Sequence, residues 1–476
     1  MINLNRLILE RLKRIDTRYL PFADAATPEL PLGRLMRLAL FQVSVGMATV
    51  LLLGTLNRVM IVELGVSASL VAVMVAIPFL AAPFRALVGF RSDTHRSAFG
   101  LRRVPYVWTG TLLQFSGLAI MPFAVLLLGT DHNAPAWVGQ VAAALAFLLA
   151  GTGLHTTQTA GLALATDLAA EDQRPRVVAL MYVVFLIGTI VSGYVFSLFL
   201  ADFSPVRLIQ VVQGAAVATF ILNVVALWKQ EVRRAPPPRT ETKPSFREAW
   251  ALFAANRQAR RFLVAVGFGT AGFNMQDIIL EPYGAEVLGL SVSATTMLTA
   301  LLGAGSLLAF ALAARWLALG LHPCRLAAIG VLAGLVAFPM VIFAGALQSP
   351  ILFQAGVCLI GFGAGLFAVS TLMAAMSLET GGLTGLALGA WGAVQASCAG
   401  LAIAVGGIVR DSIAMLGKAG SLGAAFTSPS AAYGFVYHIE ILLLFSTLVA
   451  LGPLVRTRFS REERSSTRLR LAEFPS

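Results

Sequence analysis

Charged residues are scarce in this chain. Asp, Glu, Lys and Arg make up 12% of its 476 residues, whereas a soluble domain carries about 25%. Hydrophobic residues make up 58%, and apolar runs longer than about 18 residues recur along the whole length. The low charge excludes an ordinary soluble domain. The long apolar runs predict an all-α polytopic membrane protein.

The chain also lacks the motifs of most catalysts and metal sites. Its three cysteines, Cys324, Cys358 and Cys398, are too far apart to form ligand or redox pairs. It has no G-x-x-x-x-G-K phosphate loop, no H-E-x-x-H zinc motif and no nucleophile with an evident base. We therefore expect that the protein is not an enzyme. Four of the five histidines are dispersed along the chain: His95, His132, His322 and His438.

Hydropathy predicts about twelve membrane-spanning helices, each long enough to cross about 30 Å of hydrocarbon. They are expected at residues 36–60, 67–90, 104–129, 137–165, 177–200, 206–228, 260–288, 294–319, 325–347, 350–377, 383–409 and 432–455.

The spans fall into two halves of six, residues 36–228 and 260–455, joined by a charged and proline-rich linker at 229–259. ELGVSAS at 63–69 is echoed by VLGLSVS at 287–293, and each follows the first span of its half. Two related six-helix halves around a central linker are the architecture of the major facilitator superfamily. We therefore predict a fold similar to that of the major facilitators.

The basic residues predict the orientation. The formal net charge is +12, which in a membrane protein reflects topology rather than nucleic-acid binding, because Lys and Arg collect on the cytoplasmic side. An even number of spans puts both termini on one side. Only four of the 35 Lys and Arg residues fall on the opposite side: Arg58, Arg207, Arg410 and Lys418. Both termini are therefore expected in the cytoplasm.

Two terminal segments complete the organisation. Residues 1–35 begin with MINLNRLILERLKRI, which predicts a basic amphipathic helix that lies on the membrane surface or a solvated arm. Residues 456–476 are expected to form a basic cytoplasmic tail.

The loop after the second span, GFRSDTHRSAFGLRRVPY, contains Gly89, Asp93, Arg102 and Arg103. These residues resemble the signature loop of the major facilitators, in which an acid and arginines lock the cytoplasmic side by charge-assisted hydrogen bonds. More residues than usual separate Asp93 from the arginine pair. The loop is therefore interpreted either as a lock or as a solvated topogenic segment.

The seventh predicted span carries an acidic cluster. Asn274, Asp277 and Glu281 are spaced three and four residues apart, so they share one face of a continuous helix. Pro282 should kink or end the helix. Intramembrane carboxylates indicate function by default. Three interpretations stay open: a proton-coupling site, an ion pair or cap with a partner such as Arg58, and a hydrogen bond to a ligand.

The fourth predicted span contains GTGLHTTQTAGLALATD, an unusually polar stretch for a membrane helix. His155 lies about 27 Å along the helix from the interface marker Trp137, in the cytoplasmic third of the membrane. Thr152, His155 and Thr159 share a face, with Gln158 beside it. A histidine here could donate an interhelical hydrogen bond, ligate a metal or carry protons.

Several long stretches together resemble one family. They include RYLPFADAATPELPLGRLMRLALFQVSVGMA, GLHTTQTAGLALATDLA, QDIILEPYGAEVLGLSVSATT and VYHIEILLLFSTLVALGPLVR. The chain is similar over nearly its whole length to the PucC/LhaA family of purple phototrophic bacteria, also called the bacteriochlorophyll delivery family. Its length and basic tail favour the LhaA type.

The resemblance implies a factor that assembles photosynthetic light-harvesting complexes, light-harvesting 1 and the reaction-centre core rather than light-harvesting 2. Implied partners are the antenna polypeptides, the reaction-centre core complex, bacteriochlorophyll synthase, the membrane insertion machinery and membrane lipids. The implied location is the bacterial inner, intracytoplasmic photosynthetic membrane. Bacteriochlorophyll is the implied cofactor, bound or in transit.

On this resemblance we hypothesise that His155 is an axial ligand to the magnesium of bacteriochlorophyll. Gln158, Asn274 and Gln276 would bond its carbonyl groups or ligate through water. Two rival functions stay open: a proton-coupled transporter of a small or amphipathic molecule that uses Asp277 and Glu281, and a pigment-free chaperone for antenna subunits. Apolar helix faces serve pigment, peptide and lipid alike.

Overall fold

The computed structural model describes residues 30–80, 101, 103–129, 135–170, 173–231, 256–376, 384–421, 423 and 427–471. Within these ranges every regular element is a helix. Ten helices are long and apolar enough to cross a membrane, and a bent helix pair makes an eleventh span. A shorter apolar helix lies at the second predicted span. The predicted all-α polytopic fold is confirmed.

The N-terminal half begins with a long span in which two π-helical segments interrupt the α-helix. Its helices are α2 (Leu32–Val50), the π-helical η3 (Leu51–Thr55), α3 (Leu56–Arg58), the π-helical η4 (Val59–Glu63), α4 (Ala68–Leu80), α6 (Val104–Leu126), α7 (Ala136–Leu168), α8 (Arg174–Phe199) and α9 (Pro205–Leu227).

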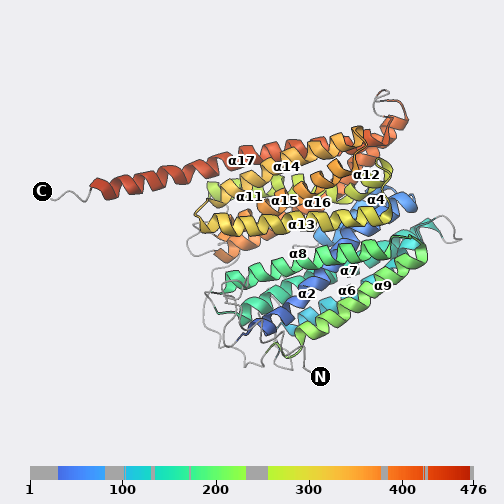
Figure 1. The fold of residues 1–476 in the computed structure, drawn as a ribbon, viewed down its shortest axis with the longest axis horizontal. Helices are drawn as coiled ribbons and strands as arrows, with labels where there is room; N and C mark the ends of the chain where they lie inside the picture. The colour runs from blue at the N-terminus through green and yellow to red at the C-terminus, as the bar shows by residue number, and fades with distance from the viewer. Residues whose placement is uncertain are drawn as a thin grey trace, which may run out of the picture.

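The C-terminal half begins with the bent pair. Its helices are α11 (Arg257–Asn274), the 3₁₀ helix η5 (Met275–Ile278), α12 (Leu280–Glu286), α13 (Val292–Ala318), α14 (Pro323–Ala346), α15 (Pro350–Met376), α16 (Thr384–Lys418) and α17 (Pro429–Leu471). The end of α17 extends beyond the bundle as helix rather than as an irregular tail (Figure 1).

The two halves lie side by side and meet through two helix pairs, α8 with α13 and α4 with α16 (Figure 1). We call the ends of the helices near Trp228 and Asn256 the linker side, and the opposite ends the far side. Among the residues that the structure describes, the side-chain hydrogen bonds between the halves lie toward the far side. Ser197 Oγ bonds Ser293 Oγ at 2.9 Å, and Thr55 Oγ1 bonds Thr296 Oγ1 at 3.2 Å.

The same turn ends the first span of each half. Gly65 and Gly289 both have a φ of 65°, a left-handed conformation that glycine adopts without strain. Val66 N donates to Met60 O, and Leu290 N donates to Gly284 O, so the same seven-residue hydrogen-bonded turn closes both helices. The predicted internal repeat is therefore confirmed at this turn.

A buried hydrogen-bonded network ties together three helices of the N-terminal half. Ser44 Oγ donates to Asn223 Oδ1 at 2.9 Å, and Asn223 Nδ2 donates to Thr111 Oγ1 at 3.0 Å. Gln114 Nε2 donates to Ser44 O at 3.0 Å. All four side chains are fully buried. These bonds hold α2, α6 and α9 together. Hydrophobic burial alone does not favour helix–helix contacts over helix–lipid contacts in a membrane.

The start of the linker is fixed to the N-terminal half. Gln230 is fully buried, and its carbonyl oxygen accepts from Arg34 Nη2 at 2.6 Å. Most of the predicted linker, residues 232–255, and most of the N-terminal arm, residues 1–29, lie outside the described residues.

Replacement of Gly153 should destabilise the N-terminal half. A Cβ atom there would lie 2.2 Å from Gln114 N, whereas a Cβ at Gly452 of α17 meets nothing within 4 Å. Overpacking of this kind costs about 1–3 kcal/mol. We expect Gly153→Leu to lower the thermal unfolding temperature in detergent and Gly452→Leu to leave it unchanged. Equal unfolding temperatures for the two variants would contradict the close approach of α6 and α7.

Candidate functional site

The seventh span is broken part-way along its length. α11 ends at Asn274, η5 follows, and α12 resumes at Leu280 after a bend of 40°. The break lies directly before Pro282, whose missing N–H cannot bond the carbonyl four residues earlier. The disruption expected from Pro282 is therefore present, but it begins earlier, at Met275, so Asn274, Asp277 and Glu281 do not share one continuous helical face.

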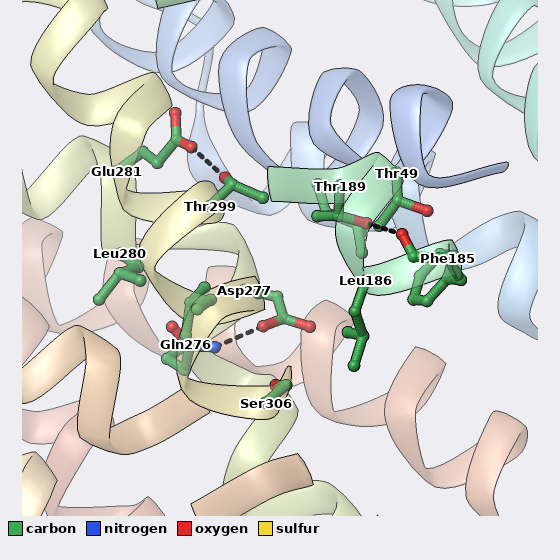
Figure 2. Close-up of a pocket in the computed structure, with 13 residues that line it drawn as sticks. Thr49, Phe185, Leu186, Thr189, Gln276, Asp277, Leu280, Glu281, Thr299 and Ser306 are labelled. Atoms are coloured by element: carbon green, nitrogen blue, oxygen red, sulfur yellow. Dashed lines mark hydrogen bonds between the residues drawn. The ribbon is translucent and has the colours of Figure 1, made fainter. Parts of the chain in front are cut away.

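A cavity of about 160 Å³ lies beside the break, between the two halves. Its walls come from α2, η3 and α8 on one side and from η5, α12 and α13 on the other. Figure 2 shows the Asp277 carboxylate pointing from the broken helix toward Leu186 of α8. The polar side chains of the lining are Thr49, Thr189, Gln276, Asp277, Glu281, Thr299 and Ser306.

The two predicted acids have different surroundings. Glu281 Oε1 accepts a hydrogen bond from Thr299 Oγ1 at 2.7 Å (Figure 2), and its Oε2 is buried without a partner among the described residues. A Cβ at Gly54 would lie 2.4 Å from Glu281 Oε1, so Glu281 requires a glycine on η3. Asp277 Oδ1 accepts from Gln276 Nε2. Both acids line the cavity.

Glu440 of α17 completes the surroundings of the break. Its side chain is fully buried, and its Oε1 accepts from Gln276 N at 2.6 Å. That N–H begins η5 and would otherwise be unpaired in the membrane interior. Glu440 was not predicted from the sequence. It is a lone acid within the apolar stretch HIEILLLFSTLVAL, and an acid inside a membrane span is the same signal that identified Asp277.

Arg58 does not form its ion pair with Asp277. It forms an ion pair with Glu63, and its Nη2 donates to Leu290 O at 3.4 Å. Asn57, its neighbour, donates from Nδ2 to Asp277 O at 3.3 Å. The interpretation in which Asp277 pairs with Arg58 is therefore wrong, because Arg58 lies closer to the far side.

The polar stretch of α7 lies away from the cavity lining. His155 is 8% exposed, and its ring packs edge-on against Phe79 of α4, with ring centroids 5.1 Å apart. Thr159 Oγ1 donates to His155 O at 2.8 Å, the self-bonding common for helical threonines. The burial and the Phe79 contact leave little open surface for a large macrocycle at His155.

The other predicted pigment ligands lie in the C-terminal half. Asn274 Nδ2 donates to Thr270 O of its own helix at 2.7 Å. Gln276 is 2% exposed and lies between Asp277 and Glu440. Only Gln276 of the four residues lines the cavity, and Gln158 lies with His155 on α7. The structure does not assemble the four into one site.

Of the signature-loop residues, Gly89, Asp93 and Arg102 lie outside the described part of the chain. Arg103 is 6% exposed, and its Nε donates to Asp167 Oδ2 at 2.8 Å. Its backbone N–H donates to the Glu231 carboxylate at 3.1 Å. This charge-assisted lock joins α6, α7 and the start of the linker within one half.

A second ionic network closes the far side. Arg410 of α16 donates to Glu286 at 2.7 Å, to Asp411 at 2.9 Å and to the Tyr433 hydroxyl at 2.9 Å. Asp411 Oδ2 also accepts from Ser69 N at 2.7 Å. A side chain of the C-terminal half thus caps the first turn of α4 in the other half.

Two larger hollows open on the outer surface. One, of about 830 Å³, lies between α8 and α9 and includes Phe199, Arg207 and Gly214. The other, of about 380 Å³, lies between α11 and α17 and includes Arg261, Phe268 and Val449. Small-molecule sites commonly enclose about 300–1,000 Å³. The outer hollows fall within that range, whereas the cavity between the halves does not.

No three His, Cys, Asp or Glu side chains of the described residues gather closely enough to hold a metal ion.

Loss of the α4 cap should destabilise the contact between the halves. Asp411→Ala removes an acceptor from Ser69 N and a partner from Arg410, and loss of a helix cap costs about 0.5–2 kcal/mol. We expect a lower thermal unfolding temperature in detergent. Asp202→Ala is the matched control, because Asp202 is 89% exposed and reaches Arg207 only at 4.0 Å. An equal effect of both substitutions would contradict the capping role.

Comparison with known proteins gives a consistent set of relatives. The family model described as PUCC protein matches residues 55–459. The product of the puhA-bchM intergenic region of Rhodobacter capsulatus is 54% identical over 96% of this chain and 97% of its own length. Protein PucC of Rhodovulum sulfidophilum is 53% identical over 87% of this chain and 92% of its own length. The bacteriochlorophyll synthase 44.5 kDa chain of Rhodobacter capsulatus is 29% identical over 88% and 95%.

Solved transporter structures share the fold at low sequence identity. A bacterial homologue of the human lysosomal transporter Spinster, in an inward-facing and unoccupied conformation, aligns with a TM-score of 0.65. The identity is 14%, and the alignment covers 89% of this chain and 97% of that one. The peptide transporter POT aligns with a TM-score of 0.64 at 17% identity, over 93% of this chain and 98% of the transporter. The two-half major-facilitator architecture predicted from sequence is thereby confirmed.

Proposed function

Because the chain belongs to the PUCC protein family, we propose that it is a non-enzymatic factor that assembles photosynthetic light-harvesting complexes. In this proposal it binds bacteriochlorophyll, nascent antenna polypeptides or both, and serves light-harvesting 1 and the reaction-centre core. The observation that carries the proposal is the family match together with identities of 54% and 53% to relatives covered almost completely. One more distant relative carries bacteriochlorophyll in its name.

The dimensions of the hollows support a cargo held on the outer surface. The cavity between the halves, of about 160 Å³, is smaller than common small-molecule sites. It is therefore too small for a tetrapyrrole or a transmembrane polypeptide. The two outer hollows, of about 830 and 380 Å³, open where such apolar cargo would arrive from lipid. Assembly by surface docking requires no passage of cargo through the protein.

In this proposal the chain resides in the photosynthetic inner membrane with its linker side in the cytoplasm. The reaction-centre core, bacteriochlorophyll synthase and the insertion machinery are proposed partners beyond the antenna polypeptides. A periplasmic-reporter fusion after Ser476 should be inactive. Activity of that reporter would contradict the proposed orientation.

The full chain purified in mild detergent from phototrophic cells should carry antenna polypeptides and absorb as bacteriochlorophyll does. The same purification from cells that lack bacteriochlorophyll tests the pigment-free chaperone. Retention of the polypeptides without pigment would favour that chaperone. Absence of both pigment and polypeptides from the wild-type preparation would contradict the proposed function.

A second candidate is a proton-coupled transporter of a small solute. The buried carboxyl groups of Asp277 and Glu281, facing a cavity between two halves of a transporter fold, are the observation that favours it. Its cargo would have to fit a small cavity or a different conformation.

Asp277→Asn and Glu281→Gln separate these two candidates. An assembly factor that docks cargo on its surface should yield the same antenna polypeptides and the same pigment absorbance with either substitution, within about twofold. A transporter should lose substrate-dependent proton movement in proteoliposomes. Loss of that movement, with assembly also lost, would overturn the surface-docking proposal.

A further inference from the structure

A histidine faces outward from α17 in the middle of an apolar stripe. His438 is exposed and lies about 14 Å along the helix from Pro429, well within the span. Its neighbours on the stripe are Phe435 at 41%, Leu442 at 64%, Phe445 at 53% and Val449 at 73% exposure. Ionisable side chains within membrane spans are rare, and almost all of them face the protein interior.

The ring of His438 is held in one tautomer. His438 Nδ1 lies 2.6 Å from Gly434 O. A carbonyl oxygen only accepts, so Nδ1 carries the proton. In the neutral ring Nε2 then presents its lone pair outward, as it does in metal-bound histidines whose other nitrogen is held by a backbone carbonyl. An exposed acceptor in hydrocarbon is costly unless a partner meets it.

The surface beside the ring is open. Side chains of an α-helix lean toward the preceding turn, so the imidazole lies over Gly434. A Cβ atom at Gly434 would meet nothing within 4 Å. The missing side chain leaves an open shelf on the helix surface at this turn. A broad, flat molecule can approach Nε2 across this shelf without displacing protein atoms.

One imidazole cannot hold a bare metal ion in a membrane. The exposed neighbours of His438 on the stripe, Phe435, Leu442, Phe445 and Val449, offer no second ligand, so a metal that binds there must bring its other ligands with it. A metal already held in a planar macrocycle, with one open axial position, meets this requirement. The groove of about 380 Å³ between α11 and α17 continues from Val449 toward the linker side, where an apolar chain attached to the macrocycle can lie.

We propose that His438 is the axial ligand for a metal-centred tetrapyrrole docked on the outer face of α17, with Gly434 as the shelf beneath it. The inference rests on the proposed function, because it names the residue that holds the pigment, and it assigns the ligand to His438 instead of His155.

The test uses the full chain, produced in a host that makes no bacteriochlorophyll and titrated with bacteriochlorophyll in mild detergent. Fluorescence quenching gives the dissociation constant, and resonance Raman spectra give the number of axial ligands on magnesium. The wild-type chain should bind pigment with five-coordinate magnesium. His438→Leu should weaken binding at least about tenfold, since loss of even a supporting partner of a ligand costs that much.

Matched variants separate ligation from packing. Gly434→Leu keeps the imidazole but fills the shelf, so it should weaken binding, whereas Gly452→Leu on the same helix should not. His438→Gly should regain its pigment spectrum when free imidazole is added. His155→Leu should bind as the wild type does. Thermal unfolding of each variant confirms that it is folded.

Binding by His438→Leu within twofold of the wild type would overturn the ligand assignment while leaving the proposed function intact. Loss of binding in His155→Leu with retention in His438→Leu would return the ligand to α7. A wild-type chain that binds no pigment in this titration overturns the His438 proposal. If it also carries no antenna polypeptides from phototrophic cells, the proposed function fails with it.

Discussion

The structure depends on one constraint, that no polar group in the membrane interior can be left to lipid. The break in the seventh span shows this constraint most clearly, because it leaves backbone N–H and C=O groups within the span without their helical hydrogen-bond partners. Glu440 accepts from Gln276 N, and Asn57 of the other half donates to Asp277 O. The first and last spans therefore hold the break in place. The cavity between the halves, the two acids that line it and part of the contact between the halves follow from this arrangement.

The same constraint distinguishes the interior of the protein from its outer face. Inside, several polar side chains bond one another across helices, as in the bonds from Ser44 to Asn223 and from Asn223 to Thr111. The interior cavity that remains is small. Outside, the His438 side chain is exposed on α17, and a large hollow lies beside Arg207. The hollows on the outer surface are larger than the cavity between the halves. Such a scaffold suits a factor that binds apolar cargo.

Hydropathy predicted the helices well because span length and apolar content are local properties. The repeat was visible in Leu64-Gly65 and Leu288-Gly289, which prove to share one turn geometry. Pro282 indicated a kink but not its place, because the break at 275–279 depends on partners from other helices. The ion pair of Arg58 with Glu63 and the role of Glu440 were not predicted, since neither contact is set by sequence spacing. His438 was dismissed as dispersed because its importance lies in its outward direction, which only the packed structure shows.

The central claim is that cargo binds the outer face of the helices and not the cavity between the halves. Photo-crosslinking in phototrophic cells tests it most directly, with a photoreactive amino acid placed either at Leu442, which is 64% exposed on α17, or at Leu302, which lines the cavity. The account predicts adducts with antenna polypeptides or pigment from position 442 and none from position 302. Adducts from position 302 alone would contradict it.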